Sequence, residues 1–178
     1  MEPFLTIAPY DPSWPAQFER ERRRIAAAFR SRAVRIEHTG STAVPGLAAK
    51  PIIDIQISVQ PLHPLEKHID RLKTLDYAHV PHADDAFCPF FRRPAEGPHT
   101  HHIHLVEAGG DEEKRVLAFR DFLREHPNEA NEYAELKRRL ATLYRVSQSE
   151  DYSEAKGDYI NAIIRRALAA GYPRDSAA

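Results

Sequence analysis

Residues 38–59 read HTGSTAVPGLAAKPIIDIQISV, and the rest of the expected fold is arranged around them. The stretch begins with a Gly-Ser turn, continues through a Pro-Gly turn and ends in a β-rich run from Pro51 to Val59. One face of that run is apolar and consists of Ile53, Ile55, Ile57 and Val59. The other face carries Ile52, Asp54, Gln56 and Ser58. This alternation predicts a strand whose apolar face packs on helices and whose polar face borders a cleft.

The loop between an expected strand at residues 33–38 and this second strand has the features of a phosphate site. Gly40 lets the backbone approach a ligand closely, and successive N–H groups in such a turn can bind phosphate oxygens. Ser41 adds a hydroxyl group, and Lys50 can supply positive charge. Asp54 suits a hard cation such as Mg²⁺, which binds through carboxylate, water and phosphate oxygens. A tight turn, a capping serine and an Asp–Arg pair would also explain these residues, but their combination with Lys50 favours the phosphate site.

Composition bounds the class of protein. The 178 residues are 42% hydrophobic and 29% charged, which is typical of a globular chain with one core. The formal net charge of −1 gives no overall attraction to nucleic acid or to an acidic membrane, so neither partner is expected. The one cysteine, Cys88, excludes an internal disulfide and a cysteine-rich zinc site. Because no segment resembles a signal peptide or a membrane span, we expect a cytoplasmic protein.

Helical and strand patterns alternate in the first part of the sequence, and helices follow. A helix is expected at residues 13–32, with a buried stripe of Trp14, Phe18, Ile25 and Phe29. The further expected elements are a helix at 64–75, a β-like region at 77–93, a strand at 100–106 and three helices after residue 111. We therefore expect an α+β fold, a mixed β-sheet flanked by helices, as one domain over residues 1–178. Its α/β core with the site would span 1–110, and its helical C-terminal part 111–172.

The segment HTHHIHLV at residues 99–106 places His102 and His104 on one face of a strand. Two histidines at i and i+2 on a strand can bind one metal ion together. If this strand neighbours the strand of Asp54, the three side chains would form a His₂Asp site suited to Zn²⁺ or Mn²⁺. It is equally open that the histidines are polar sheet residues or bind phosphate. Glu37, just before the loop, is a substitute acid near the metal or a salt-bridge partner.

Basic and aromatic side chains of the C-terminal helices offer a second wall for the site. Arg120 lies on the first of these expected helices, and Lys137 shares a helical face with Tyr144, seven residues later. Lys156 lies at the start of the last helix. Because arginine and lysine bind phosphates and a base can stack on tyrosine, we predict that these four residues contact a nucleotide. For each residue alone, a solvated helix face is the alternative.

The segment EHTGSTAVPGLAAKPIIDI at residues 37–55 resembles the signature of the GrpB family, a branch of the nucleotidyltransferase superfamily. The resemblance continues through HTHHIHLV, VLAFRDFLREHP and YAELKRRLA, and it covers nearly the whole chain. It implies a nucleotidyltransferase-like mixed β-sheet with a helical C-terminal third. In that superfamily a Gly-Ser turn holds the phosphates of a nucleotide. An Asp-x-Asp/Glu pair and a third carboxylate on a later strand hold two metal ions.

Residue by residue, Gly40 and Ser41 match the Gly-Ser turn, and Asp54 matches the first acid. Gln56 occupies the second acid position, which is a departure from the pattern. The resemblance implies a protein that binds a nucleotide or phosphorylated small molecule with a divalent cation, Mg²⁺ or Mn²⁺ or alternatively Zn²⁺. If active, it would transfer a nucleotidyl group. A catalytically degenerate nucleotide-binding module and a His/Asp metal-dependent hydrolase are the alternatives.

Overall fold

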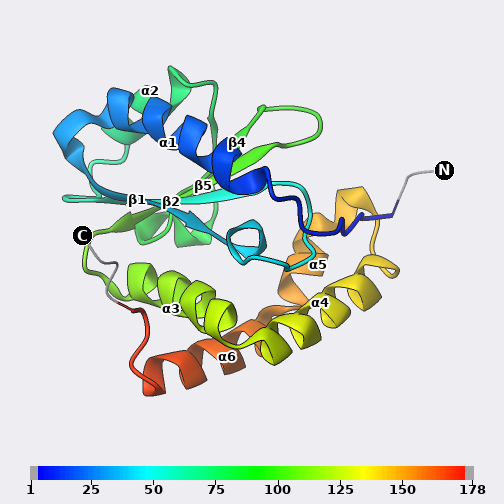
Figure 1. Cartoon of the computed structure of the whole chain (residues 1–178). Coiled ribbons are helices and arrows are strands. Elements are labelled where there is room, and N and C mark those ends of the chain that lie inside the picture. Colours follow the sequence, from blue (N-terminus) through cyan, green and yellow to red (C-terminus); the bar gives the residue numbers. More distant parts are fainter. Residues whose placement is uncertain (1–3, 175–178) are drawn as a thin grey trace.

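The computed structural model describes residues 4–174 of the chain. Within those residues it is a mixed α+β structure with one five-stranded sheet and six α-helices (Figure 1). The strands are β1 (Ala33–Thr39), β2 (Ile53–Val59), β3 (Ala78–Val80), β4 (Phe90–Arg93) and β5 (His101–Glu107). The helices are α1 (Trp14–Phe29), α2 (Glu66–Lys73), α3 (Asp111–Glu125), α4 (Pro127–Ala141), α5 (Ser149–Glu154) and α6 (Gly157–Ala169). The α+β class and the helical C-terminal part are confirmed.

The sheet is mixed, with strand order β1-β2-β5-β4-β3. β2 and β5 are parallel neighbours, and the other pairs are antiparallel. The β2–β5 register places Asp54 opposite His102 and Gln56 opposite His104. Because residues opposite one another share a face of the sheet, His102 and His104 lie on the face that carries Asp54 and Gln56, so the strand pairing on which the predicted cluster depended is present.

The apolar face of the sheet is covered by α1 and α2, which lie together on one side in Figure 1. The core on this side includes the predicted stripe of α1, namely Trp14, Phe18, Ile25 and Phe29. It also includes the apolar face of β2, namely Ile53, Ile55, Ile57 and Val59. Burial of each such side chain contributes about 1.5–3 kcal/mol relative to exposure. This core therefore fixes the orientation of β2, with its apolar face toward α1 and α2 and its polar face on the opposite side of the sheet.

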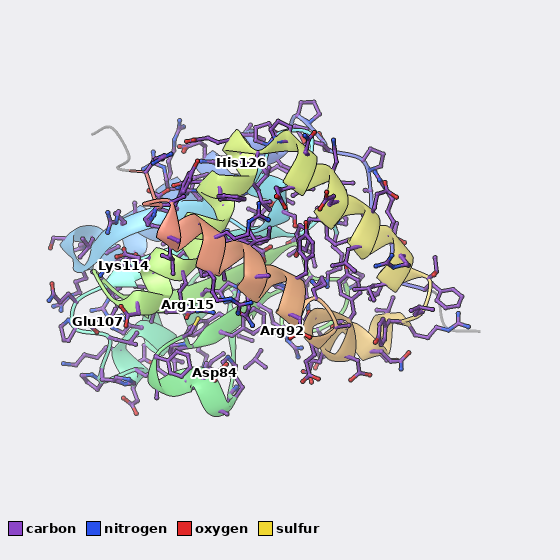
Figure 2. All side chains as sticks on the ribbon, turned by 90° about the horizontal axis from the view of Figure 1, so that it is seen from below. Asp84, Arg92, Glu107, Lys114, Arg115 and His126 are labelled. Atoms are coloured by element: carbon purple, nitrogen blue, oxygen red, sulfur yellow. The ribbon has the colours of Figure 1, made fainter. Side chains whose placement is uncertain are left out.

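The other side of the sheet faces α3, α4 and α6, which Figure 2 shows lying together when the molecule is viewed from below. A second apolar core joins these helices to the loop between β1 and β2. The loop contributes Val44, Leu47 and Ala48. Phe122, Tyr133 and Ile163 from the three helices pack in the same cluster. The Gly-Ser loop is therefore attached to the sheet at its ends and to the helical part through its middle.

Two local predictions were wrong. α4 ends at Ala141, so Tyr144 lies beyond the helix rather than on the face of Lys137. The helix ends there because residues 142–145 turn back toward the N-terminal segment, where the Leu5 N–H donates to the Tyr144 carbonyl at 3.2 Å. The short helix α5 was not predicted.

Within residues 4–174, each helix is too short or too polar to cross a membrane.

Candidate functional site

A cavity of about 670 Å³ lies between the polar face of the sheet and the C-terminal helical part. This volume falls within the range of about 300–1,000 Å³ that is typical of small-molecule sites. Its sheet side is lined by Asp54, Phe90, Arg92, His102 and His104, among others. Its loop and helix side is lined by Ser41, Lys50, Lys137, Tyr152 and Lys156, among others. The cavity thus brings together the loop, the acid and lysines from well separated parts of the sequence.

Gly40 and Asp54 are in direct contact at the edge of this cavity. Gly40 has a φ of +65°, in the left-handed region that favours glycine. A β-carbon added to Gly40 would lie 2.3 Å from Oδ2 of Asp54, well inside van der Waals contact. The residue before Ser41 therefore has to be glycine for the loop to close on the acid.

Lys137 reaches the loop from α4 and is 3% exposed. Its Nζ lies 2.9 Å from Oγ of Ser41 and also donates to the carbonyl oxygen of Ala48. The same Nζ lies 4.7 Å from the centre of the Tyr133 ring, a cation–π distance. These contacts hold the ammonium group of Lys137 against the Gly-Ser turn.

Lys50 and Lys156 both lie within cation–π distance of the ring of Tyr152. Their Nζ atoms lie 5.1 Å and 4.2 Å from the centre of that ring. Tyr152 is 1% exposed, and its buried hydroxyl group has no hydrogen-bond partner among residues 4–174. A buried hydroxyl without a partner is costly in the free protein, so this group is available to a ligand atom or water in the cavity.

Burial lowers the pKa values of all three lysines, and repulsion by neighbouring cations adds to this for Lys137 and Lys156. Burial, with the charges of Lys156 and Arg138, lowers the pKa of Lys137 to about 7. Burial and the charge of Lys50 lower the pKa of Lys156 to about 8. Burial also lowers the pKa of Lys50, against the attraction of Asp54. An anion in the cavity would favour the charged form of each lysine.

Asp54 is the carboxylate nearest these lysines on the sheet. Its Oδ1 lies 3.4 Å from Nδ1 of His102, whose Nε2 lies 3.5 Å from Nδ1 of His99. Burial raises the pKa of Asp54, but the hydrogen bond and charge of His102, with help from His104 and Lys50, hold it below the usual value. Asp54 is therefore ionised at neutral pH.

The donors around Asp54 do not fit a two-metal site. Gln56, at the second acid position, is fully buried, and neither of its amide atoms has a partner among the described residues. His104 has its Nδ1 3.9 Å from Sγ of Cys88. Within residues 4–174 there is no group of three or more His, Cys, Asp or Glu side chains placed to hold a metal ion. One carboxylate is still sufficient for a Mg²⁺ ion that takes its other ligands from water and ligand phosphates.

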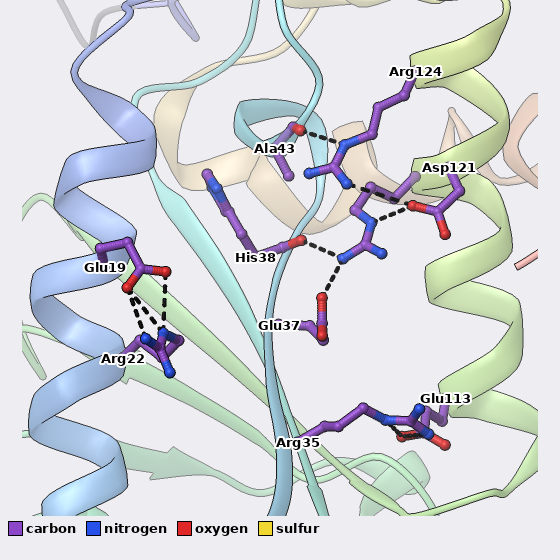
Figure 3. A network of polar contacts seen from close by, with 10 residues as sticks. Glu19, Arg22, Arg35, Glu37, His38, Ala43, Glu113, Asp121 and Arg124 are labelled. Carbon is purple, nitrogen blue, oxygen red and sulfur yellow. Dashed lines mark hydrogen bonds and ion pairs between the residues drawn. The ribbon is translucent and has the colours of Figure 1, made fainter. Parts of the chain in front are cut away.

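Glu37 and Arg120, predicted as site residues, are held in a separate network of ion pairs (Figure 3). Nη1 of Arg120 donates to Oε2 of Glu37 at 2.7 Å and to the His38 carbonyl at 3.1 Å. Its Nε donates to Asp121 at 2.7 Å. Neither residue lines the cavity, because the carboxylate of Glu37 is turned toward α3. Of the roles considered for Glu37, the observed one is that of a salt-bridge partner, to Arg120.

Tyr144 is also absent from the residues that line the cavity. Its ring lies edge-on to Tyr152, with the two ring centres 6.4 Å apart. Tyr152 itself lines the cavity and was missed by the sequence reasoning, as were Phe90 and His99. The available signal for Tyr152 was its position four residues before Lys156, although the structure places Tyr152 in α5 and Lys156 directly before α6.

Comparison with known proteins places the chain in a family. The sequence model described as GrpB protein matches residues 5–166, so the chain belongs to the GrpB family. A UPF0157 protein of Halalkalibacterium halodurans is 37% identical over 166 residues, covering 93% of this chain and 83% of that protein. The crystal structure of the conserved protein GrpB from Enterococcus faecalis superposes with a TM-score of 0.79 at 31% identity, covering 93% of this chain and 98% of that one. The resemblance to GrpB is confirmed.

A partial match points to a different kind of protein. Over 81 aligned residues, this chain is 41% identical to a dephospho-CoA kinase of Mycolicibacterium paratuberculosis. The match covers 44% of this chain and only 20% of the kinase. A segment related to part of this chain therefore occurs within a larger protein that has that name.

Proposed function

We propose that this GrpB-family chain binds a phosphorylated small molecule, with nucleotides as the favoured class, in the cavity between the sheet and the C-terminal helices. The observation that carries the proposal is that Lys50, Lys137 and Lys156 all line one cavity beside the Gly-Ser turn. Three desolvated ammonium groups repel one another unless an anion lies between them. A phosphate group matches their charge and the hydrogen-bond donors of the loop.

The position of the loop and the acid supports a nucleotide over other phosphorylated molecules. A Gly-Ser turn after one strand, followed by an aspartate on the neighbouring strand, is the arrangement expected of a nucleotidyltransferase-like fold. Asp54 would hold a single Mg²⁺ or Mn²⁺ ion shared with the phosphates, and that ion would neutralise phosphate charge. Ser41 and the three lysines bind and orient the phosphates. The wall around Phe90 and His99 offers aromatic rings for a base.

The cavity lining also includes three exposed acidic side chains. Asp84, Glu150 and Glu154 are all exposed there. Exposed carboxylates are screened by solvent, so they weaken the attraction for an anion far less than a buried one would. The attraction for phosphate is therefore concentrated at buried Lys137 and half-buried Lys50 and Lys156.

The alternatives differ in the fate of the bound ligand. A transferase releases pyrophosphate from a bound nucleoside triphosphate, whereas a binding module retains its ligand unchanged. Gln56 in place of the second acid favours the module. A His/Asp metal-dependent hydrolase has less support, because His104 is not brought together with Asp54 and His102 as a three-donor site within the described residues.

Calorimetric titration tests the proposal. The ligands are ATP, CTP, GTP, UTP and dephospho-CoA, each with and without Mg²⁺; the last is included because of the partial match to the kinase. We expect at least one of them to bind, with higher affinity when Mg²⁺ is present. Asp54→Asn should abolish the gain from Mg²⁺ and should strengthen metal-free binding, because it removes a negative charge. If no ligand binds, the proposal fails.

A further inference from the structure

The hydroxyl group of Ser41 and the amine of Lys137 also form a close pair, beyond the phosphate contacts proposed for each of them. Oγ and Nζ are 2.9 Å apart, within reach for direct proton transfer. The second contact of Nζ, to the Ala48 carbonyl, can only be made by an N–H of the lysine. A neutral amine in this geometry donates to Ala48 and has its lone pair free to accept the proton of Ser41.

The environment favours the neutral amine. Lys137 is 3% exposed and is surrounded by the rings and backbone of α4 and the loop. The charged groups that face it are Lys156 and Arg138, which oppose its protonation, and Asp54, which favours it. Their combined effect with burial lowers the pKa of Lys137 to about 7. A base with a pKa near the working pH is the kind that general-base catalysis needs.

Ser41 is placed so that a substrate can reach it. It lines the cavity, and it begins the short 3₁₀ turn Ser41–Ala43 directly after the left-handed residue Gly40. The loop that carries it is fixed by the second apolar core and by Arg124, whose Nε donates to the Ala43 carbonyl at 2.9 Å. A nucleophile needs this combination of a fixed backbone, an adjacent base and access from a cavity.

We propose that Ser41 and Lys137 form a serine–lysine nucleophilic pair that acts on carboxylic esters or thioesters whose remote part is anionic. Oγ of Ser41 attacks the carbonyl carbon, and its proton passes to the neutral Nζ of Lys137. The bond to the leaving oxygen or sulfur breaks, and the leaving group takes that proton. Water then attacks the acyl-Ser41 ester, gives one proton to Lys137 and releases the acid, and the proton returns to Oγ of Ser41. Only the preference for an anionic substrate rests on the proposed phosphate site, where Lys50 and Lys156 hold the anion and Lys137 stays neutral to act as the base.

A fluorophosphonate probe tests the pair without knowledge of the natural substrate. Attack by Oγ forms a Ser41–phosphorus bond, expels fluoride and transfers the serine proton to Lys137. We expect one equivalent of label by intact mass, mapped to Ser41, with a labelling rate that rises with pH through about 7 and then levels. Ser41→Ala should abolish the label. The matched control is Ser153→Ala, because Ser153 also lines the cavity but donates to the Ser149 carbonyl rather than to a lysine.

Lys137→Arg separates the base from the charge. Arginine keeps the positive charge but cannot become neutral, so we expect labelling to slow by about 100-fold or more. p-Nitrophenyl acetate hydrolysis should fall in parallel, and thermal unfolding of each variant shows whether it is folded. The proposal is overturned if folded wild-type protein is not labelled, if the label lies on another residue, or if Lys137→Arg reacts at the wild-type rate. Any of these outcomes leaves phosphate binding by calorimetry unaffected.

Discussion

Gly40 and Asp54 touch so closely that no side chain fits between them, since a β-carbon on Gly40 would lie 2.3 Å from Oδ2 of Asp54. This contact joins the loop that is proposed to bind phosphate to the acid that is proposed to hold the cation. The spacing between the two functional groups is therefore set by van der Waals contact rather than by a flexible linker.

Gly40→Ala should lower both the stability and the ligand affinity of the protein. Gly40 has φ +65° and ψ −169°, a backbone region nearly restricted to glycine, which costs a residue with a β-carbon about 1–3 kcal/mol. The overlap with Asp54 adds about 1–3 kcal/mol, as is usual for overpacking. Gly46→Ala is the matched control, because Gly46 has a φ of +79° but nothing lies within 4 Å of the position that its β-carbon would take. Urea unfolding measures both variants, and equal losses of stability would contradict the close contact.

Arg120 is predicted to stabilise the fold rather than to bind ligand. It is 4% exposed and pairs with Glu37 and Asp121. Arg120→Met should lower the free energy of unfolding by up to about 3–5 kcal/mol, because it leaves the half-buried Glu37 without its ion-pair partner and Asp121 with Arg124 alone. Arg115→Met, at an exposed pair with Glu112, should cost at most about 1 kcal/mol. Arg120→Met that remains folded at low temperature should bind pyrophosphate with unchanged affinity; a large loss of affinity would place Arg120 in the site.

The lowered pKa of Lys137 has a consequence for stability. The folded-state pKa is about 7, whereas the ordinary lysine value is 10.5. Between these values the unfolded chain binds a proton that the folded chain does not, so the contribution of Lys137 to stability increases with pH. The slope is at most about 1.4 kcal/mol per pH unit. Urea unfolding at pH 7 and pH 9 should show a steeper rise in wild type than in Lys137→Met. Identical pH dependence in the two proteins would mean that the pKa of Lys137 is not lowered.

The sheet and its faces could be predicted from local sequence patterns. The alternation from Ile53 to Val59 identified both faces of β2, because burial repeats with the same period as the strand. The position of His102 beside Asp54 depended on one further step, the pairing of two strands, which the sequence left as a condition and the structure supplies. Local periodicity and strand adjacency were sufficient for this half of the site.

The helical wall could not be predicted with the same accuracy. Arg120, Lys137, Tyr144 and Lys156 were all reasonable ligand contacts from their chemistry, but only Lys137 and Lys156 line the cavity. Which face of a helix meets the site depends on how that helix packs against distant segments. Arg120 instead pairs with Glu37, which is 83 residues away in sequence. The end of α4 depends on a contact with the N-terminal segment, so Tyr144 was misplaced for the same reason.

The central claim is that the three lysines of the cavity bind phosphate, and calorimetric titration with inorganic pyrophosphate at pH 7 tests it most directly. Lys156→Met should weaken binding by about tenfold or more, since a charge-assisted contact contributes about 1.5–3 kcal/mol. Lys114→Met is the matched control, because Lys114 is an exposed lysine on α3, labelled in Figure 2, that does not line the cavity. We expect unchanged affinity for the control and the tenfold loss for Lys156→Met. Equal affinity in all three proteins, or no binding by wild type, would contradict the claim.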